Sequence, residues 1–185
     1  ILIILAIYLY NEKFNIFHYI VMIIMNFYLY SLTYSRTGFL IGVLCIVLGV
    51  VQKSKKVEKI FARVFKNSYF WAVLVTLFIG YFYTKIPQLK NLDELFTGRL
   101  AYNHTLLNNY IPPLIGSSKY NEYVNIDNGF ISLIYQGGIL AFLWISACII
   151  KLMNDFYIQK KFRELFFMSS FIVYGMTESF FPNIA

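Results

Sequence analysis

Apolar runs long enough to cross a lipid bilayer recur along this chain and are separated by short polar segments. A helix needs about 20 apolar residues to cross the hydrocarbon core, with roughly 17 to 25 tolerated. Hydrophobic residues make up 59% of the 185 residues, and Phe, Tyr and Trp alone make up 20%. A soluble domain of this length cannot bury that much apolar surface. The sequence therefore predicts an all-α integral membrane protein.

Six membrane-spanning helices are predicted, and the first is cut by the start of the sequence. Their ranges are 1–10, 14–34, 38–51, 69–86, 129–153 and 165–181. The chain begins inside an apolar run, with no Met and no basic region before it. We therefore expect a single membrane domain over residues 1–185 that belongs to a longer protein.

Basic residues are concentrated in two of the connecting segments. Residues 52–68 hold six Lys and Arg against one acid, and the connection at 154–164 adds three more basic residues. Basic loops of membrane proteins face the cytoplasm, so both segments are predicted inside. Residues 87–128 carry three basic and four acidic residues, which suits a large extracytoplasmic loop. The net charge of +7 thus reports cytoplasmic loops, and no nucleic-acid partner is expected.

Arg36 lies in the SRTG turn (35–38) between two predicted spans, on the outer side by the same count. An arginine at a helix end can simply extend to the lipid headgroups. The turn is tight and the following span is short, so we expect the turn to dip below the headgroups, where ionisable groups line polar cavities. Thr37 and Gly38 are expected to leave backbone amides free at the next helix N-terminus, which favours an anion.

An amphipathic helix is predicted within residues 91–118 of the outer loop, because apolar residues recur there every three or four positions. Gly98 loosens this helix, and a pair of prolines ends it. His104 lies about 140° round an ideal helix from Arg99, so both reach one cavity only if the helix bends. A surface helix with a solvated arginine is the alternative.

Two acidic residues on the outer side are candidate proton acceptors, together with His104. Asp127 or Asn128 directly precedes an apolar helix, and N-capping by itself accounts for an acid there, so capping and catalysis both remain open. Glu178 lies near the outer end of the last apolar run, where a buried carboxylate has a raised pKa or pairs with an arginine. A purely structural ion pair is the alternative for Glu178. Gln136, Gly137 and Gly138 fall inside the predicted span, where small residues such as the two glycines favour close helix packing.

The sequence lacks the patterns typical of metal and nucleotide sites. It has no HExxH, no cluster of Cys and His, no DxD pair and no glycine-rich nucleotide loop. We therefore expect no metal and no cofactor.

Four motifs occur in order on the outer side of the predicted membrane protein. SRTG opens a short span, Gly98-Arg99 starts a helix, LIGSS (114–118) follows, and IDNGFISLIYQGGIL (126–140) leads into the next span. Their order and common sidedness resemble the C-terminal half of Wzy-type O-antigen, capsule and exopolysaccharide repeat-unit polymerases, a superfamily shared with the O-antigen ligases. The resemblance covers residues 32–183.

The resemblance implies glycosyl transfer on the outer face of the plasma (inner) membrane, from a polyprenyl-diphosphate-linked oligosaccharide to a hydroxyl of the next lipid-linked unit. Arg36 and Arg99 would bind the leaving diphosphate, because guanidinium groups bind phosphate oxygens through paired hydrogen bonds. Glu178, His104 or Asp127 would accept the proton of the hydroxyl. Two arginines would make the reaction metal-independent. A flippase, a chain-length regulator and membrane lipid are the implied partners.

Other functions fit part of the same pattern. A ligase would transfer finished glycan to a lipid, a protein or a cell-wall polymer and would share the diphosphate site. A transporter of lipid-linked oligosaccharide predicts charges at mid-membrane depth and internal symmetry, whereas the polar residues here gather on one face. A purely structural subunit would leave the long outer loop unexplained.

Overall fold

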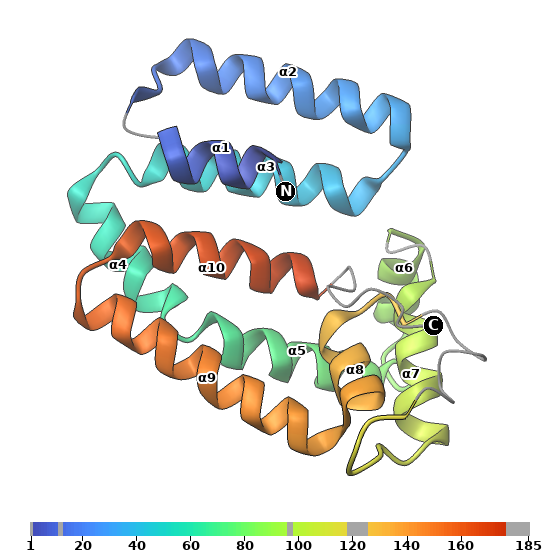
Figure 1. Ribbon diagram of the computed structural model, residues 1–185. Coiled ribbons are helices and arrows are strands. Elements are labelled where there is room, and N and C mark those ends of the chain that lie inside the picture. Colours follow the sequence, from blue (N-terminus) through green and yellow to red (C-terminus); the bar gives the residue numbers. More distant parts are fainter. Residues whose placement is uncertain (1, 11–12, 96–97, 118–125, 177–185) are drawn as a thin grey trace. The chain divides into compact units, whose positions relative to one another are not determined.

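The computed structural model describes residues 2–10, 13–95, 98–117 and 126–176, and its regular elements in these ranges are all helices (Figure 1). They are α1 (Leu2–Tyr10), α2 (Ile16–Thr33), α3 (Arg36–Val51), α4 (Lys55–Phe65), α5 (Ser68–Phe82), α6 (Pro87–Leu95), α7 (Arg99–Asn109), α8 (Gly129–Ser132), the π-helical turn η3 (Leu133–Gly137), α9 (Gly138–Ile158) and α10 (Phe162–Gly175). The all-α prediction is confirmed for these residues. The chain divides into two compact units, Ile1–Ser68 with Leu152–Phe171, and Tyr69–Lys151 with Ile172–Ala185.

Two helical stretches among the described residues are long and apolar enough to cross a membrane. They are α2 and the stretch Gly129–Ile158, which comprises α8, η3 and α9. A third is added if the consecutive helices Val57–Phe65 and Ser68–Phe82, which bend at the break between them, form one span. The helices are therefore compatible with a membrane protein, with fewer spans by this measure than the six that the sequence predicts.

Helix length explains the difference between the two counts. Helices α1, α3, α5 and α10 contain 9, 16, 15 and 14 residues. At about 1.5 Å per residue, the longest of them reaches about 24 Å, short of the roughly 30 Å hydrocarbon core. Apolar composition continues past the ends of α5 and α10 in the sequence, but the helices end at Phe82 and Gly175. Part of the predicted span at 165–181 lies outside the described residues.

In the first unit, α2 and α3 form a tight antiparallel hairpin (Figure 1). Tyr34 ends α2 in the left-handed region, with φ of 52°. Ser35 then caps α3, its hydroxyl oxygen accepting the N–H of Gly38 at 3.3 Å. The turn therefore satisfies its own helix ends within two residues, which is what a short connection between antiparallel helices requires.

A polar contact fixes how α2 packs against α3. The buried amide of Asn26 donates a hydrogen bond to the carbonyl of Phe39 at 3.0 Å. A Cβ at Gly42 would lie 2.3 Å from Asn26 Oδ1, so the absence of a side chain at Gly42 makes room for this amide. A glycine with an interhelical hydrogen bond is typical of close helix packing in membranes.

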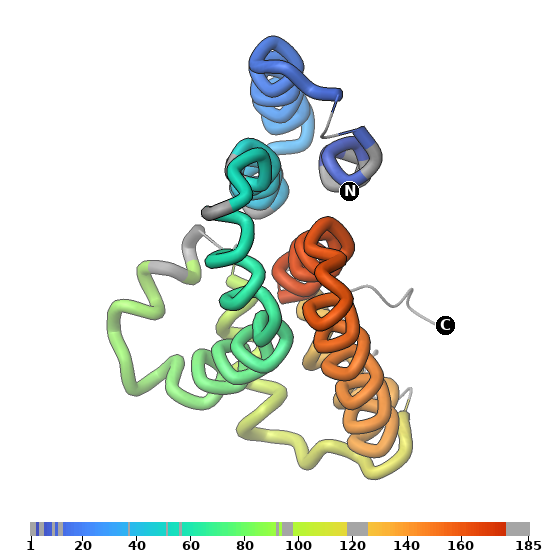
Figure 2. Tube along the Cα trace, turned by 90° about the vertical axis from the view of Figure 1, so that its left-hand side faces the viewer, coloured from blue at the N-terminus to red at the C-terminus, as the bar shows by residue number. Residues whose placement is uncertain are grey.

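Helix α3 also packs against α1 (Figure 2, which views these helices nearly end-on). Gly49 lies opposite Ile7, where a Cβ would come within 3.0 Å of the Ile7 side chain. Tyr19 donates a hydrogen bond from its hydroxyl to the Gly49 carbonyl at 3.3 Å. Glycine again permits the close approach of two helices to α3.

In the second unit, α7 packs against α5 and against the start of the long helical stretch. The buried apolar cluster between α7 and the start of this stretch consists of Leu106, Leu107, Ile126, Ile131, Ile134 and Tyr135. Gly80 of α5 faces Leu107, since a Cβ there would lie 2.3 Å from Leu107 Cδ1. The hydroxyl of the fully buried Tyr135 donates to the Leu106 and Tyr110 carbonyls, each at 2.9 Å. These contacts hold the C-terminal half of α7 in place.

The long helical stretch is interrupted where η3 meets α9. Gly138 has φ of 86°, and a Cβ on it would lie 2.6 Å from the Gly116 nitrogen. The next two amides, of Ile139 and Leu140, donate to the Pro113 and Leu114 carbonyls at 2.9 and 3.2 Å. Close packing therefore occurs at 136–138, but the partner is the loop at 113–116, where the sequence predicts another helix.

Candidate functional site

The segment predicted as one amphipathic helix forms two helices, α6 and α7, with a break at Gly98. Gly98 has φ of 80° and occupies the N-cap position of α7, where it has no side chain to bond the first amides. A residue with a side chain resists this backbone conformation, so glycine starts a new helix here and does more than loosen the old one. The expected single helix is therefore wrong, and the break puts Arg99 at the first position of α7.

Asp93 on α6 caps α7 from the side. The Leu100 N–H donates to its Oδ1 at 2.8 Å, and the Ala101 N–H donates to its Oδ2 at 3.2 Å. The Tyr83 hydroxyl also donates to Oδ2, at 2.8 Å. The carboxylate is 5% exposed and lies at the positive end of the helix dipole. Sequence reasoning missed Asp93, and the available signal was an acid a few residues before a helix that begins with glycine.

Arg99 forms an ion pair with Asp127, the acid that precedes the long helical stretch. Arg99 Nε lies 3.2 Å from Asp127 Oδ2, and the two side chains are 24% and 44% exposed. The pair is therefore accessible from solvent. It brings together two of the residues that the sequence predicts for the site.

Asn128, and not Asp127, is the N-cap of α8. Asn128 Oδ1 accepts the N–H groups of Phe130 and Ile131 at 3.0 and 3.2 Å. The amide of Asn128 donates to the Met176 carbonyl at 2.6 Å, which ties the end of α10 to this helix start. The sequence left capping and catalysis open for Asp127, and the structure removes the capping explanation.

His104 is directed from α7 toward α5. Its Nδ1 lies 2.7 Å from the Gly80 carbonyl oxygen, which can only accept, so Nδ1 carries the proton. The lone pair of the neutral ring is then on Nε2. Asn108 Nδ2 lies 2.9 Å from the same Nδ1 and 2.9 Å from the His104 carbonyl, and it donates to the carbonyl because Nδ1 is already a donor.

Arg99 and His104 leave α7 on different sides. The helix runs unbroken from Arg99 to Asn109, so the chain bends before Arg99 and not between the two residues. Arg99 contacts Asp127, whereas His104 contacts Gly80. A bend between Arg99 and His104, which the sequence requires to bring both residues into one cavity, is therefore absent from α7.

Arg36 is the first residue of α3 and is exposed. The Gly38 amide, expected to be free for an anion, is bonded by the Ser35 hydroxyl, so that part of the prediction is wrong. Arg36 belongs to the first unit and Arg99 to the second. Their predicted joint binding of one diphosphate stays a prediction.

Glu178, the third predicted proton acceptor, lies outside the described residues. The described chain ends at Met176, whose carbonyl is bonded by Asn128, the neighbour of Asp127.

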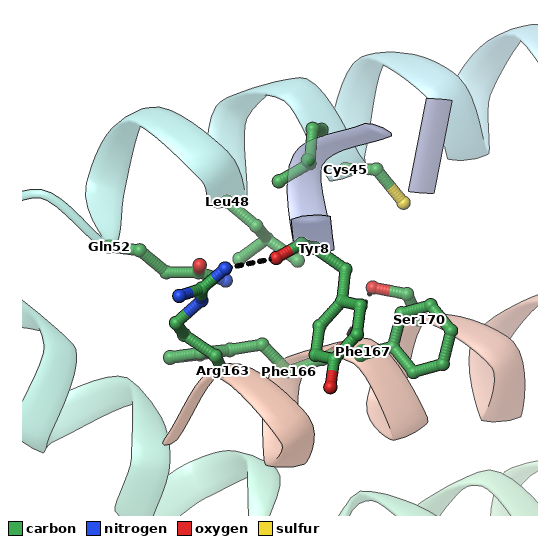
Figure 3. A pocket seen from close by; sticks show the side chains of 9 residues that line it. Tyr8, Cys45, Leu48, Gln52, Arg163, Phe166, Phe167 and Ser170 are labelled. Carbon is green, nitrogen blue, oxygen red and sulfur yellow. Dashed lines mark hydrogen bonds between the residues drawn. The ribbon is translucent and has the colours of Figure 1, made fainter. Parts of the chain in front are cut away.

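A small cavity lies in the first unit, lined by α1, α3 and α10 (Figure 3). Arg163 extends along it and donates from Nη2 to the Tyr8 carbonyl, with Gln52 beside the guanidinium and Cys45 and Ser170 toward the other end. Its volume of about 20 Å³ accommodates roughly one water molecule. The cavity is too small for a sugar.

Within the described ranges, no group of three or more His, Cys, Asp and Glu is placed to hold a metal ion. Comparison of the chain with protein-family models, curated proteins and solved structures finds no match. Among the described residues, the Arg99–Asp127 pair is the arrangement of charged groups that best supports a functional assignment.

Proposed function

We propose that the chain polymerises polyprenyl-diphosphate-linked oligosaccharide repeat units into surface polysaccharide on the outer face of the plasma membrane. In this proposal the chain crosses the membrane with the six predicted spans, residues 87–128 lie outside, and residues 52–68 lie in the cytoplasm. The observation that carries the proposal is the accessible Arg99–Asp127 pair in the outer segment, where a guanidinium adjoins a carboxylate that has no capping role.

Arg99 is the proposed ligand of the diphosphate. A guanidinium binds phosphate oxygens through two parallel hydrogen bonds, and a diphosphate carries more charge than the single carboxylate of Asp127. The diphosphate would therefore displace Asp127 from Arg99 on binding. The position of Arg99 at the first turn of α7 adds the positive end of the helix dipole to the same site, although Asp93 offsets part of it.

Asp127 is the proposed general base. Once released from Arg99, its carboxylate accepts the proton of the acceptor hydroxyl, whose oxygen attacks the anomeric carbon of the growing chain. The glycosidic carbon–oxygen bond to the diphosphate breaks, and its electron pair leaves with the diphosphate. Arg99 stabilises the negative charge that develops there. A displaced ion-pair partner thus becomes the base beside the leaving group.

The geometry favours Asp127 over His104 for this step. A general base must come within about 3 Å of the proton that it removes. Asp127 contacts the proposed diphosphate ligand, whereas His104 contacts α5 from another side of the same helix. His104 then has a structural role, its ring joining α7 to the Gly80 carbonyl. Arg36 remains a second proposed diphosphate ligand, from the SRTG turn.

A deletion strain complemented with the full-length protein tests the proposal. We expect the strain without the protein to accumulate single repeat units on the lipid carrier and to lose polymer, and complementation to restore the polymer ladder. Full-length polymer stranded on its carrier would instead identify a ligase. Loss of polymer with single lipid-linked units held on the inner leaflet, and not on the outer one, would identify a transporter.

A further inference from the structure

Over its last two turns, helix α4 separates basic and apolar residues into two adjacent rows. The segment 52–68 contains six basic residues and one acid. Lys55, Lys59 and Arg63 recur every four positions and form one row of α4. Ile60 and Val64 form a second row beside it, also four residues apart.

A third side of α4 packs against the rest of the first unit. Ala62 is fully buried, and the Phe65 ring lies edge-on to the Phe166 ring of α10, with 5.3 Å between centroids. The Ser169 hydroxyl, also on α10, donates to the Phe65 carbonyl at 3.4 Å. This contact fixes the rotation of α4 about its axis and so decides which rows remain outside.

Both rows are left on the outside of the protein. Ile60 and Val64 are 65% and 62% exposed, and Lys59 and Arg63 are exposed beside them. The two other basic residues of the segment that have described contacts are turned toward the protein: Lys53 Nζ donates to the Phe14 carbonyl, and Lys66 Nζ lies 5.1 Å from the Tyr157 ring centroid.

No single solvent suits this outward surface. Lysine and arginine are costly in the hydrocarbon core, so α4 does not lie within it. Large apolar side chains beside a basic row are unfavourable in open water. The membrane–water interface accommodates both, because an amphipathic helix there directs apolar residues to the acyl boundary and basic residues to the headgroups.

We propose that α4 is an interfacial helix that binds anionic phospholipid headgroups of the cytoplasmic leaflet. Ile60 and Val64 enter the acyl boundary, and Lys59 and Arg63 contact the lipid phosphates. The apolar row identifies a lipid surface as the partner, since a soluble anion would leave Ile60 and Val64 in water. The inference rests on the cytoplasmic placement of 52–68 and not on the transferase chemistry.

Spin-label accessibility in the full-length protein tests the depth of α4. Cys45→Ala and Cys148→Ala remove the native thiols, and single cysteines at 59, 60, 63 or 64 carry a nitroxide in phosphatidylcholine vesicles with and without phosphatidylglycerol. We expect labels at 60 and 64 to be relaxed more by oxygen than by a water-soluble nickel chelate, and labels at 59 and 63 to show the opposite order. Ile24→Cys in α2 provides the hydrocarbon reference.

Charge variants test the preference for anionic lipid. Lys59→Gln with Arg63→Gln removes two basic contacts with lipid, about one from each residue. It should therefore lower the preference of α4 for phosphatidylglycerol over phosphatidylcholine roughly 30-fold. Lys85→Gln with Lys90→Gln makes the same charge change elsewhere and should leave the preference unaltered.

Equal nickel access at all four positions places α4 in open water and overturns the proposal. Protection of the labels from both oxygen and the nickel chelate would mean that protein covers α4. Equal lipid preference of the two charge variants would mean that Lys59 and Arg63 do not recognise anionic lipid. Either result also overturns the proposal. Glycan synthesis is not read in any of these measurements, so failure here is distinguishable from failure of the proposed transferase.

Discussion

Arg99 Nε lies 3.2 Å from Asp127 Oδ2, although the two residues belong to helix starts separated by 27 intervening positions in the sequence. Asn128 caps α8 and leaves the Asp127 carboxylate to the guanidinium. Asn128 thus takes the capping role that either residue could fill. Asp127 forms an ion pair that a competing anion can displace. This division of roles is the basis of the proposed mechanism.

Replacement of the base should abolish activity without unfolding the protein. Asp127→Asn retains the size of the side chain but removes the proton acceptor, so we expect polymer synthesis to fall about 10²- to 10⁴-fold. A partly exposed ion pair contributes only about 0–1 kcal/mol, so the abundance of the variant should stay near that of the parent. The glycan ladder and the protein level measured together check this.

Asn128→Asp is the paired variant, because Asp retains the helix cap but loses the amide donor to the Met176 carbonyl. It should lower the protein level, while the polymer made per molecule of protein stays near that of the parent. If Asp127→Asn retains the full ladder while Asn128→Asp loses it per molecule of protein, the assignment of the two roles is reversed.

Lysine should not substitute for Arg99. Arg99→Lys retains the charge but loses the planar pair of donors, and we expect a loss of about 10²-fold in the rate of polymerisation, comparable to removal of one preorganised donor. The rate is measured with lipid-linked repeat units and purified full-length protein. Arg36→Lys is assayed in parallel, and full activity of both lysine variants would contradict diphosphate binding by paired hydrogen bonds.

The buried carboxylate of Asp93 should matter for stability. Asp93→Ala removes the acceptor for two backbone amides of α7 and for the Tyr83 hydroxyl, and leaving buried donors unpaired costs about 1–3 kcal/mol. We expect a lower thermal midpoint in detergent. Lys90→Gln, an exposed change on the same helix, is the control and should leave the midpoint unchanged. An unchanged midpoint in Asp93→Ala would show that α7 does not depend on this cap.

Two adjacent glycines should tolerate alanine very differently. Gly138→Ala places a side chain at φ of 86° and brings Cβ within 2.6 Å of the Gly116 backbone, so we expect strong destabilisation, with strain alone costing about 1–3 kcal/mol. A Cβ on Gly137 meets only the Leu133 and Ala141 side chains, at 3.1 and 3.4 Å. Gly137→Ala should therefore unfold near the parent temperature. Similar midpoints for both variants would contradict the described loop contact.

Local composition determined the helical class and the position of the longest helices. Helix α2 and the stretch Gly129–Ile158 lie within two residues of where apolar runs predict them to begin, because a long apolar segment has to satisfy its backbone hydrogen bonds internally wherever it lies. The basic character of 52–68 is likewise a property of adjacent residues. Helix ends were less predictable, since α5 and α10 end before their apolar runs do.

Tertiary structure decided what each polar residue does. Asp127 and Asn128 are equivalent as cap candidates in the sequence, and only the position of Arg99 separates their roles. Asp93 caps α7 from another helix, and Gly138 is required because the loop at 113–116 crosses the helix there. The physical reason is range: helix formation depends on neighbours within a turn or two, whereas ion pairs, remote caps and close backbone contacts depend on groups that only folding brings together.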